Sequence, residues 1–186
     1  MNFDLSKNIQ ILNLLANKEG WSINYTKAIK LLFFADKLYL RNFWKTISGD
    51  NYSALKLGPV PSSTFNVIKS PEEYNEHEIN QYIKKDDYNI TSITDVDMDF
   101  FSKKEIETLD KIYQYFWSMN YQQLIDETHK YVEWKRHEHI ANAWSSANMT
   151  ISDFFENSVN QHEIFDMPDD DLELSKSIFL DYNING

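Results

Sequence analysis

Apolar side chains recur at helical spacing through the first two segments of the chain. Asp4 is a suitable N-cap for the first segment and Gly20 follows its last apolar position, so a helix is predicted from about Asp4 to Lys18. A second helix is predicted from about Asn24 to Asn42. Its apolar residues lie nearly all around the helix, so we expect it to occupy the centre of the domain.

A capping-box pattern marks a later helix. Ser102 and Glu105 are spaced so that each side chain accepts a hydrogen bond from the other residue's backbone N–H, and the helix continues through Phe116. Pro61 suits the first position of another short helix, which ends before Pro71. Further short helices are expected over residues 121–128, 134–143 and 152–157.

Aromatic and β-branched residues indicate short strands. One is predicted over residues 52–57, after a turn at residues 48–51. Two more are predicted over residues 82–83 and 88–93, joined by a turn at residues 84–87. The pattern therefore predicts one compact helical domain, mainly α with a small antiparallel β-sheet (α+β).

Composition excludes several classes of protein. The 186 residues include no cysteine, which excludes disulfide scaffolds, thiolate zinc sites and cysteine nucleophiles. The longest uninterrupted apolar run covers only residues 31–35, and the N-terminal segment is too polar for a signal peptide. We therefore expect a cytoplasmic protein that does not interact with membranes.

The charge is distributed unevenly along the chain. The formal net charge is −11, which disfavours nucleic acid as a partner. Residues 1–69 nevertheless carry 9 basic and 4 acidic side chains, whereas residues 159–186 carry 1 basic and 7 acidic side chains. The two ends of the chain thus differ in sign.

Part of the positive charge falls on one side of the second predicted helix, where Lys27, Lys30, Lys37 and Arg41 form a basic stripe that Lys45 extends. A solvent-exposed face of a core helix is the favoured interpretation. The alternatives are a surface for an acidic partner or for the acidic end of this chain. A DNA-binding surface is a less favoured possibility.

Residues 158–186 are expected to form an acidic extension, here called the C-terminal arm, beyond a domain of residues 1–157. Acidic residues alternate in it with large apolar ones, which is typical of a segment that orders only on a partner. An arm that docks on its own domain fits equally well. The candidate partner-contact residues are Phe165, Asp166, Met167, Asp169, Asp170, Asp171 and Phe179.

The chain offers no catalytic, cofactor or metal constellation, and we do not expect an enzyme. His137 and His139 are two residues apart and point to nearly opposite sides of a helix, which does not suit a helical zinc pair. The four glycines are isolated, so neither a phosphate-binding loop nor a dinucleotide fingerprint occurs. No Gly-x-Ser-x-Gly nucleophile elbow is present.

One longer motif is more specific. The string that begins Gly49-Asp50-Asn51-Tyr52 and ends Gly58-Pro59-Val60-Pro61-Ser62 resembles the Panacea domain, the SocA-like antitoxin or phage-associated-protein family. The resemblance covers about residues 5–145. We expect fold maintenance to be the main role of the matching residues. Within the string they are Gly49, Asp50, Tyr52, Gly58, Pro59 and Pro61. The resemblance also includes residues 30–36, which end at Asp36, and later His129 and Trp134.

The resemblance implies an antitoxin that neutralises a cognate toxin by direct binding. The C-terminal arm lies outside the resemblance, and its negative charge and apolar residues separately suggest that it covers a basic surface of the toxin. As an alternative it implies an adaptor that delivers the toxin to a cytoplasmic protease. An autoregulator that binds DNA through the basic stripe is the less favoured alternative, and formation of a homodimer is left open. Trp44 stands where the family usually has Gly, so we expect Asn42 to end the second helix instead. Leu57 stands where His is common.

Overall fold

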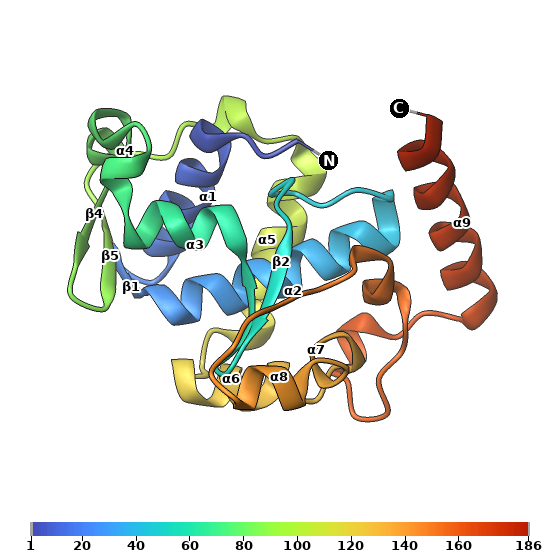
Figure 1. Cartoon of the computed structure of the whole chain (residues 1–186). Coiled ribbons are helices and arrows are strands. Elements are labelled where there is room, and N and C mark those ends of the chain that lie inside the picture. Colours follow the sequence, from blue (N-terminus) through green and yellow to red (C-terminus); the bar gives the residue numbers. More distant parts are fainter. Residues whose placement is uncertain (1, 186) are drawn as a thin grey trace.

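Helix α2 (Tyr25–Phe43) runs through the middle of the molecule, as its apolar surface predicts (Figure 1). The structure is a computed structural model that describes residues 2–185, with side chains through residue 181. Asn24 caps α2 by accepting hydrogen bonds from the backbone N–H groups of Thr26 and Lys27. Helices predominate, and the predicted fold class is confirmed.

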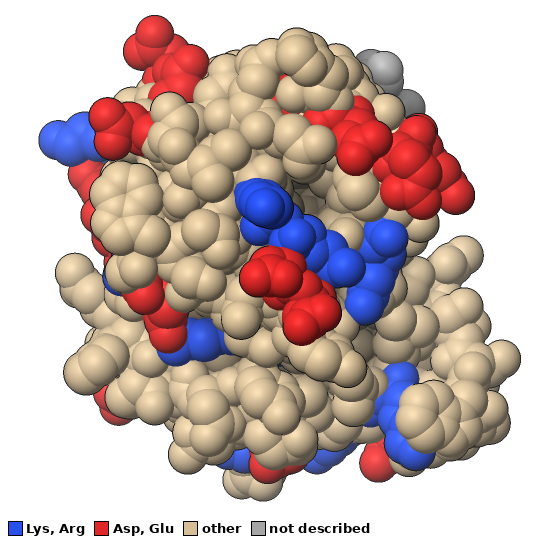
Figure 2. Space-filling view, turned by 90° about the vertical axis from the view of Figure 1, so that its left-hand side faces the viewer, with Lys and Arg blue, Asp and Glu red and all other residues tan. Residues whose placement is uncertain are grey.

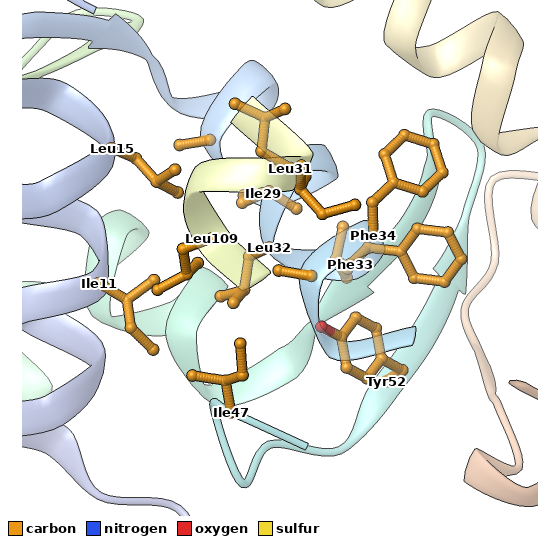
Figure 3. Packing of buried hydrophobic residues seen from close by; sticks show 14 of the residues in the cluster. Ile11, Leu15, Ile29, Leu31, Leu32, Phe33, Phe34, Ile47, Tyr52 and Leu109 are labelled. Carbon is orange, nitrogen blue, oxygen red and sulfur yellow. The ribbon is translucent and has the colours of Figure 1, made fainter. Parts of the chain in front are cut away.

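Two amphipathic helices pack against α2, and both begin as predicted. Asp4 caps α1 (Leu5–Lys18), and both hydrogen bonds of the capping box are present at the start of α5 (Lys103–Phe116). Figure 3 shows Leu15 and Leu109 beside α2, in the aliphatic part of the core. Each of these helices buries one apolar side, which is the periodic pattern from which both were predicted.

The other side of α2 carries an aromatic cluster. Figure 3 shows Phe33 beside Tyr52, and their ring centroids lie 5.8 Å apart. The ring centroid of Phe154 lies 5.3 Å from that of Phe33. Phe34 stacks on Phe116 at 4.6 Å and lies 5.5 Å from Phe165. Because Phe165 belongs to the C-terminal arm, this part of the chain completes the core.

The structure contains two three-stranded antiparallel sheets rather than the single small sheet that was predicted. The first has the order β1 (Ser22–Asn24), β5 (Asn89–Ser92) and β4 (Ile83–Asp86). Its hairpin turns at Asp87 and Tyr88, where Asp87 has φ 47°. The second has the order β3 (Gly58–Pro61), β2 (Tyr52–Leu55) and β6 (Ala147–Asn148).

Several shorter helices differ from the prediction. The helix expected over residues 134–143 is two helices, because the chain leaves helical geometry at His137 (φ −108°, ψ 3°). The helix expected over residues 152–157 is a 3-10 turn. Helix α4 had no predicted counterpart. The remaining elements are α3 (Ser62–Lys69), α4 (Glu76–Tyr82), α6 (Tyr121–Thr128), α7 (Val132–Lys135), α8 (Glu138–Asn142), α9 (Asp169–Asn185), and the 3-10 turns η1 (Pro71–Glu73), η2 (Met98–Phe100), η3 (Ile151–Phe155) and η4 (Glu163–Phe165).

The end of α2 corrects one expectation. Trp44 itself adopts the left-handed conformation (φ 61°, ψ 19°), and its backbone N–H donates to the carbonyl oxygen of Leu40. Asn42 remains helical and donates its side-chain amide to the carbonyl oxygen of Leu38. A tryptophan thus occupies the conformation that usually favours glycine.

The C-terminal arm is ordered and docked along its described length. Helix α9 lies at the edge of the molecule opposite β4 and β5 (Figure 1) and packs against η3 and α2. Leu172 and Phe179 are buried on its inner face, and the Phe179 ring lies 5.5 Å from that of Phe155. Of the two interpretations that the sequence left open, the structure has the arm docked on its own domain.

Candidate partner-binding surface and the core that supports it

The basic stripe is buried, so its favoured interpretation as a solvent-exposed face was wrong. Lys27 is 6 % exposed, Lys30 1 %, Lys37 0 % and Arg41 1 %. The physical reason is the central position of α2, whose charged side chains reach carbonyl and carboxylate oxygens of surrounding segments. The DNA-binding alternative depended on this stripe. Its four residues on α2 are buried, and Lys45, which extends the stripe beyond the helix, is exposed.

Two of the buried lysines have carboxylate partners. Lys27 Nζ lies 2.5 Å from Glu19 Oε1, and Lys37 Nζ lies 2.7 Å from Glu133 Oε1. Both side chains of the second pair are fully buried, and burial lowers the pKa of Lys37 to about 8. Lys30 differs, because its one hydrogen bond within the described residues runs to the carbonyl oxygen of Pro59.

Arg41 connects α2 to residues 154–157 and, at Phe165, to the C-terminal arm. Its Nε donates to the carbonyl oxygen of Phe154 at 2.7 Å, and Nη2 donates to that of Glu156 at 2.6 Å. Nη1 donates to the carbonyl oxygen of Phe165 at 2.6 Å and to Asn157 Oδ1 at 3.1 Å. Burial lowers the pKa of Arg41 to about 10, which leaves the guanidinium charged at neutral pH. Arg41 therefore holds the arm at the main-chain oxygen of Phe165, whose ring is buried in the core.

The structure separates the candidate partner-contact residues into two groups. Phe165 and Phe179 are buried in this chain's own core, at 1 % and 6 % exposure. Met167 is half-buried. The carboxylates face solvent, and they are Asp166, Asp169, Asp170 and Asp171. In this docked state, acidic groups rather than aromatic rings are available to a partner.

Two leucines add apolar area beside these carboxylates. Leu174 is 61 % exposed and Leu180 is 41 % exposed on α9. Glu173 and Asp181 are also exposed on this helix. The outer surface of α9 thus combines negative charge with large apolar side chains. Both leucines are among the large apolar residues of the arm, but they were not among the candidate partner-contact residues predicted from the sequence.

The opposite part of the molecule has a different character. Figure 2 shows the face that carries α3, α4 and the first sheet, where Lys and Arg side chains gather at the centre. Asp and Glu side chains lie beside them, and other residues cover most of the face. The charges on this face are mixed in sign.

Asp36 of the family motif joins α2 to the loop before β2. Its Oδ1 accepts from the backbone N–H groups of Ile47 at 2.7 Å and Ser48 at 3.0 Å, and its Oδ2 accepts from the hydroxyl groups of Ser48 and Tyr52. The carboxyl group is fully buried, and this burial raises its pKa to about 6. The expected structural role of Asp36 and Tyr52 is consistent with these contacts.

Asp50 caps a helix that lies later in the chain. Pro61 precedes α3 and provides no side-chain cap. Asp50 instead accepts from the backbone N–H groups of Ser63 at 3.0 Å and Thr64 at 2.7 Å. These two N–H groups at the start of α3 therefore find their acceptor 13 and 14 positions earlier in the sequence.

The motif glycines permit two close approaches. A Cβ atom at Gly49 (φ +67°) would lie 2.3 Å from the carbonyl oxygen of Asn2. A Cβ atom at Gly58 (φ +94°) would lie 2.6 Å from Thr128 Oγ1 and 3.0 Å from Lys30 Nζ. Gly58 and Pro59 lie in β3, which pairs with β2. These residues shape the hairpin that lies against α2.

His129 and Trp134 pack together beside the same hairpin, and Trp134 is hydrogen-bonded to it. Their rings stack with centroids 3.7 Å apart, and Trp134 Nε1 donates to the carbonyl oxygen of Leu55 at 2.9 Å. Burial lowers the pKa of His129, and the positive charge of Lys30 lowers it further. Trp134 is 1 % exposed, as expected for a core residue.

No group of three His, Asp or Glu side chains within residues 2–185 is arranged to hold a metal ion. Among the helices of the described chain, none combines the length and hydropathy that crossing a bilayer requires. The division of the chain at residue 157 stays a prediction, although Phe165 beyond it packs in the shared core.

Comparison with known proteins supports the resemblance that the motif indicated. Residues 29–135, more than half of the chain, match the family described as "Antitoxin SocA-like, Panacea domain". Neither the curated proteins nor the solved structures gave a match. The matched range contains all the motif residues, from Asp36 to Trp134, whose contacts build the centre of the domain. The chain therefore belongs to the SocA-like antitoxin family and carries a Panacea domain.

Proposed function

We propose that this chain is the antitoxin of a toxin–antitoxin pair and neutralises its toxin by direct, stoichiometric binding. Membership of the SocA-like antitoxin family is the single observation that carries the proposal. The proposed contact is the outer surface of α9 with Asp166 and Met167, and its partner surface on the toxin is basic. No catalytic step is required of the antitoxin.

The structure modifies how the arm would act. Phe165 and Phe179 fix the arm to its own domain, so the toxin contact is assigned to the exposed carboxylates together with Leu174 and Leu180. A docked surface loses less conformational entropy on binding than a disordered segment does. The carboxylates would accelerate association through long-range attraction, and the leucines would slow dissociation.

Surface substitutions test this proposal better than truncation. Removing the chain after Asn157 would also remove Phe165 from the core and confuse a folding defect with a binding defect. We therefore propose the triple variant Asp169→Asn, Asp170→Asn and Asp171→Asn, which changes only exposed groups. The toxin used is the protein encoded in the adjoining reading frame, and surface plasmon resonance measures both rate constants.

The triple variant should lower the association rate constant about tenfold at low salt, and the effect should fade at high salt. A matched control neutralises three exposed carboxylates elsewhere, with Glu72→Gln, Glu73→Gln and Glu76→Gln, and should leave the rate nearly unchanged. Equal effects of the two triples would mean that only net charge matters and that α9 is not the contact.

A second variant tests the apolar part of the surface. Leu174→Ser with Leu180→Ser should raise the dissociation rate constant about tenfold or more, since well-packed apolar groups dominate dissociation. Circular dichroism would verify that the fold is retained, because both side chains are exposed. An unchanged dissociation rate in a folded double variant would remove the leucines from the proposed contact.

A further inference from the structure

A half-open pocket of about 290 Å³ lies between α2, the β2–β3 hairpin, α3 and the connection that follows α8. Apolar side chains form most of its lining, among them Ile29, Val60, Phe65 and Trp144. The arm and the outer surface of α9 do not contribute to it. Its volume is at the lower end of the range typical of small-molecule sites, about 300 to 1,000 Å³.

The charged groups of this pocket all have the same sign. Lys30, Lys56 and Lys69 line it, and its lining includes no Asp or Glu. Lys56 Nζ lies 3.6 Å from the ring centroid of Trp144. Lys69 Nζ lies 4.3 Å from the ring centroid of Tyr25 and 2.7 Å from its hydroxyl oxygen. On a chain of net charge −11, three converging lysines favour an anionic ligand.

Lys30 is a buried ammonium group without a carboxylate partner. It is 1 % exposed and donates one hydrogen bond, to the carbonyl oxygen of Pro59 at 2.8 Å. No acidic oxygen of the described residues lies within ion-pair distance of it, whereas Lys27 and Lys37 on the same helix each have one. Burying a charge without a counterion raises the free energy of the folded protein. A bound anion would supply the missing counterion at this position.

We propose that this pocket binds a small apolar carboxylate, whose hydrocarbon part contacts the apolar lining and whose anionic group pairs with Lys30. Lys56 and Lys69 flank the same pocket and increase the local concentration of anions. A bicyclic aromatic ring fits within the pocket volume of about 290 Å³. This inference does not depend on the proposed antitoxin function.

Binding should be coupled to protonation. Burial lowers the pKa of Lys30 to about 7, so the free protein contains much neutral amine at slightly alkaline pH. A bound carboxylate stabilises the ammonium form and raises this pKa, so the complex takes up a proton. The other ionisable side chains of the lining are Lys56, Lys69 and Tyr25, and His129 lies near Lys30; none of these residues carries a carboxylate.

Three probes of equal size test the charge preference by isothermal titration calorimetry on the full chain. They are 2-naphthoate, 2-naphthylmethanol and 2-naphthylmethylammonium. We expect the carboxylate to bind at least about tenfold more tightly than the alcohol, and the ammonium compound to bind least. Titrations of naphthoate in buffers of different ionisation enthalpy near pH 8 should report uptake of about one proton. Equal affinities of the three probes, or no binding of naphthoate, would overturn the proposal.

Two variants assign the effect to the pocket. Lys30→Met keeps the length of the side chain, removes the charge and should abolish both the carboxylate preference and the proton uptake, while naphthylmethanol binds as before. Lys56→Gln with Lys69→Gln leaves the buried group intact and should weaken naphthoate binding severalfold with proton uptake retained. Lys135→Met, at an exposed position, is the control and should change neither quantity. Retention of the preference and of proton uptake in a folded Lys30→Met protein would contradict the assignment.

The same chemistry can come from a free molecule or from an acidic aromatic segment of a protein. The peptide N-acetyl-Trp-Asp-amide distinguishes these sources in the same titration. Tighter binding of naphthoate identifies a free carboxylate as the natural class of ligand. Tighter binding of the peptide, lost in Lys30→Met, identifies a protein segment. Failure of both to bind would overturn the proposal and leave the proposed antitoxin function untouched.

Discussion

The guanidinium group of Arg41 donates a 2.6 Å hydrogen bond to the carbonyl oxygen of Phe165, which lies 124 positions later in the chain. The same side chain donates to the carbonyl oxygens of Phe154 and Glu156. One buried cation therefore satisfies three main-chain acceptors in segments that have no regular sheet to supply donors. It thereby holds the acidic arm at a main-chain oxygen, in addition to the 3.2 Å hydrogen bond that Asn157 donates to the carboxylate of Asp169.

We predict that Arg41→Lys loosens the arm. A lysine cannot reach all of these acceptors, and each buried carbonyl oxygen left unpaired costs about 1 to 3 kcal/mol, so the free energy of unfolding should fall by about 3 kcal/mol. Hydrogen exchange of residues 158–181 should accelerate more than that of α1. The control is Arg136→Lys, an exposed arginine paired with Asp153 and Glu156, which should cost less than about 1 kcal/mol.

The buried pair of Lys37 and Glu133 gives a second prediction. Either Lys37→Met or Glu133→Met leaves an uncompensated buried charge and should lower the free energy of unfolding by about 3 to 5 kcal/mol. The double variant removes both charges and should be more stable than either single variant. Urea denaturation of the four proteins measures this coupling. Additive losses in the double variant would show that the charges do not compensate each other.

A matched exposed pair provides the control for that cycle. Lys104 and Glu107 lie 2.8 Å apart, with side chains 61 % and 47 % exposed. Lys104→Met should leave the free energy of unfolding nearly unchanged, because solvent screens this pair and already hydrates both charges. The contrast between the two pairs isolates the effect of burial from that of distance.

Asp36 should make stability depend on pH. Its pKa is raised to about 6 in the folded chain, so the folded protein holds this proton more tightly than the unfolded chain does. Its contribution to the free energy of unfolding therefore decreases as pH rises from about 4 to about 6, and the decrease amounts to about 3 kcal/mol. Asp36→Asn cannot ionise, so the stability of wild type relative to this variant should decline over that interval. A constant difference between pH 4 and 7 would contradict the prediction.

Asp50 should contribute more than an ordinary helix cap. Asp50→Ala leaves the backbone N–H groups of Ser63 and Thr64 without acceptors and should cost about 2 to 3 kcal/mol. Asp4→Ala removes a single cap hydrogen bond, from the N–H of Lys7, and should cost about 1 kcal/mol. Thermal denaturation of both variants compares them. A smaller loss for Asp50→Ala would mean that α3 does not depend on this carboxylate.

Local signals identified most of the helices correctly. Asp4, Asn24 and Ser102 cap the helices that the pattern placed after them, because a cap acts on residues within one turn. Helix α4 was not predicted, since Ile79 is its one buried residue and it has no apolar stripe. The left-handed conformation of Trp44 was also not predictable, since tryptophan has no preference for it.

The candidate site was harder to predict, because it depends on distant parts of the chain. Lys37 and Arg41 were predicted to lie at the surface because they are charged. Their partners Glu133 and Phe165 lie about a hundred positions later in the sequence, so local patterns could not indicate that the two side chains are buried. Composition identified the acidic, apolar character of the arm but not which of its groups point outward. Phe179 and Leu174 have similar hydropathy, yet one is buried and the other is exposed on the same helix.

Native mass spectrometry tests the central claim most directly. It measures the mass of the species that this chain forms with the product of the adjoining reading frame. A neutralising antitoxin that binds its toxin predicts a mass equal to a whole-number combination of both chains, under conditions in which the toxin alone arrests growth and the pair does not. Rescue of growth with only the separate masses present, or a harmless neighbouring product, would contradict it.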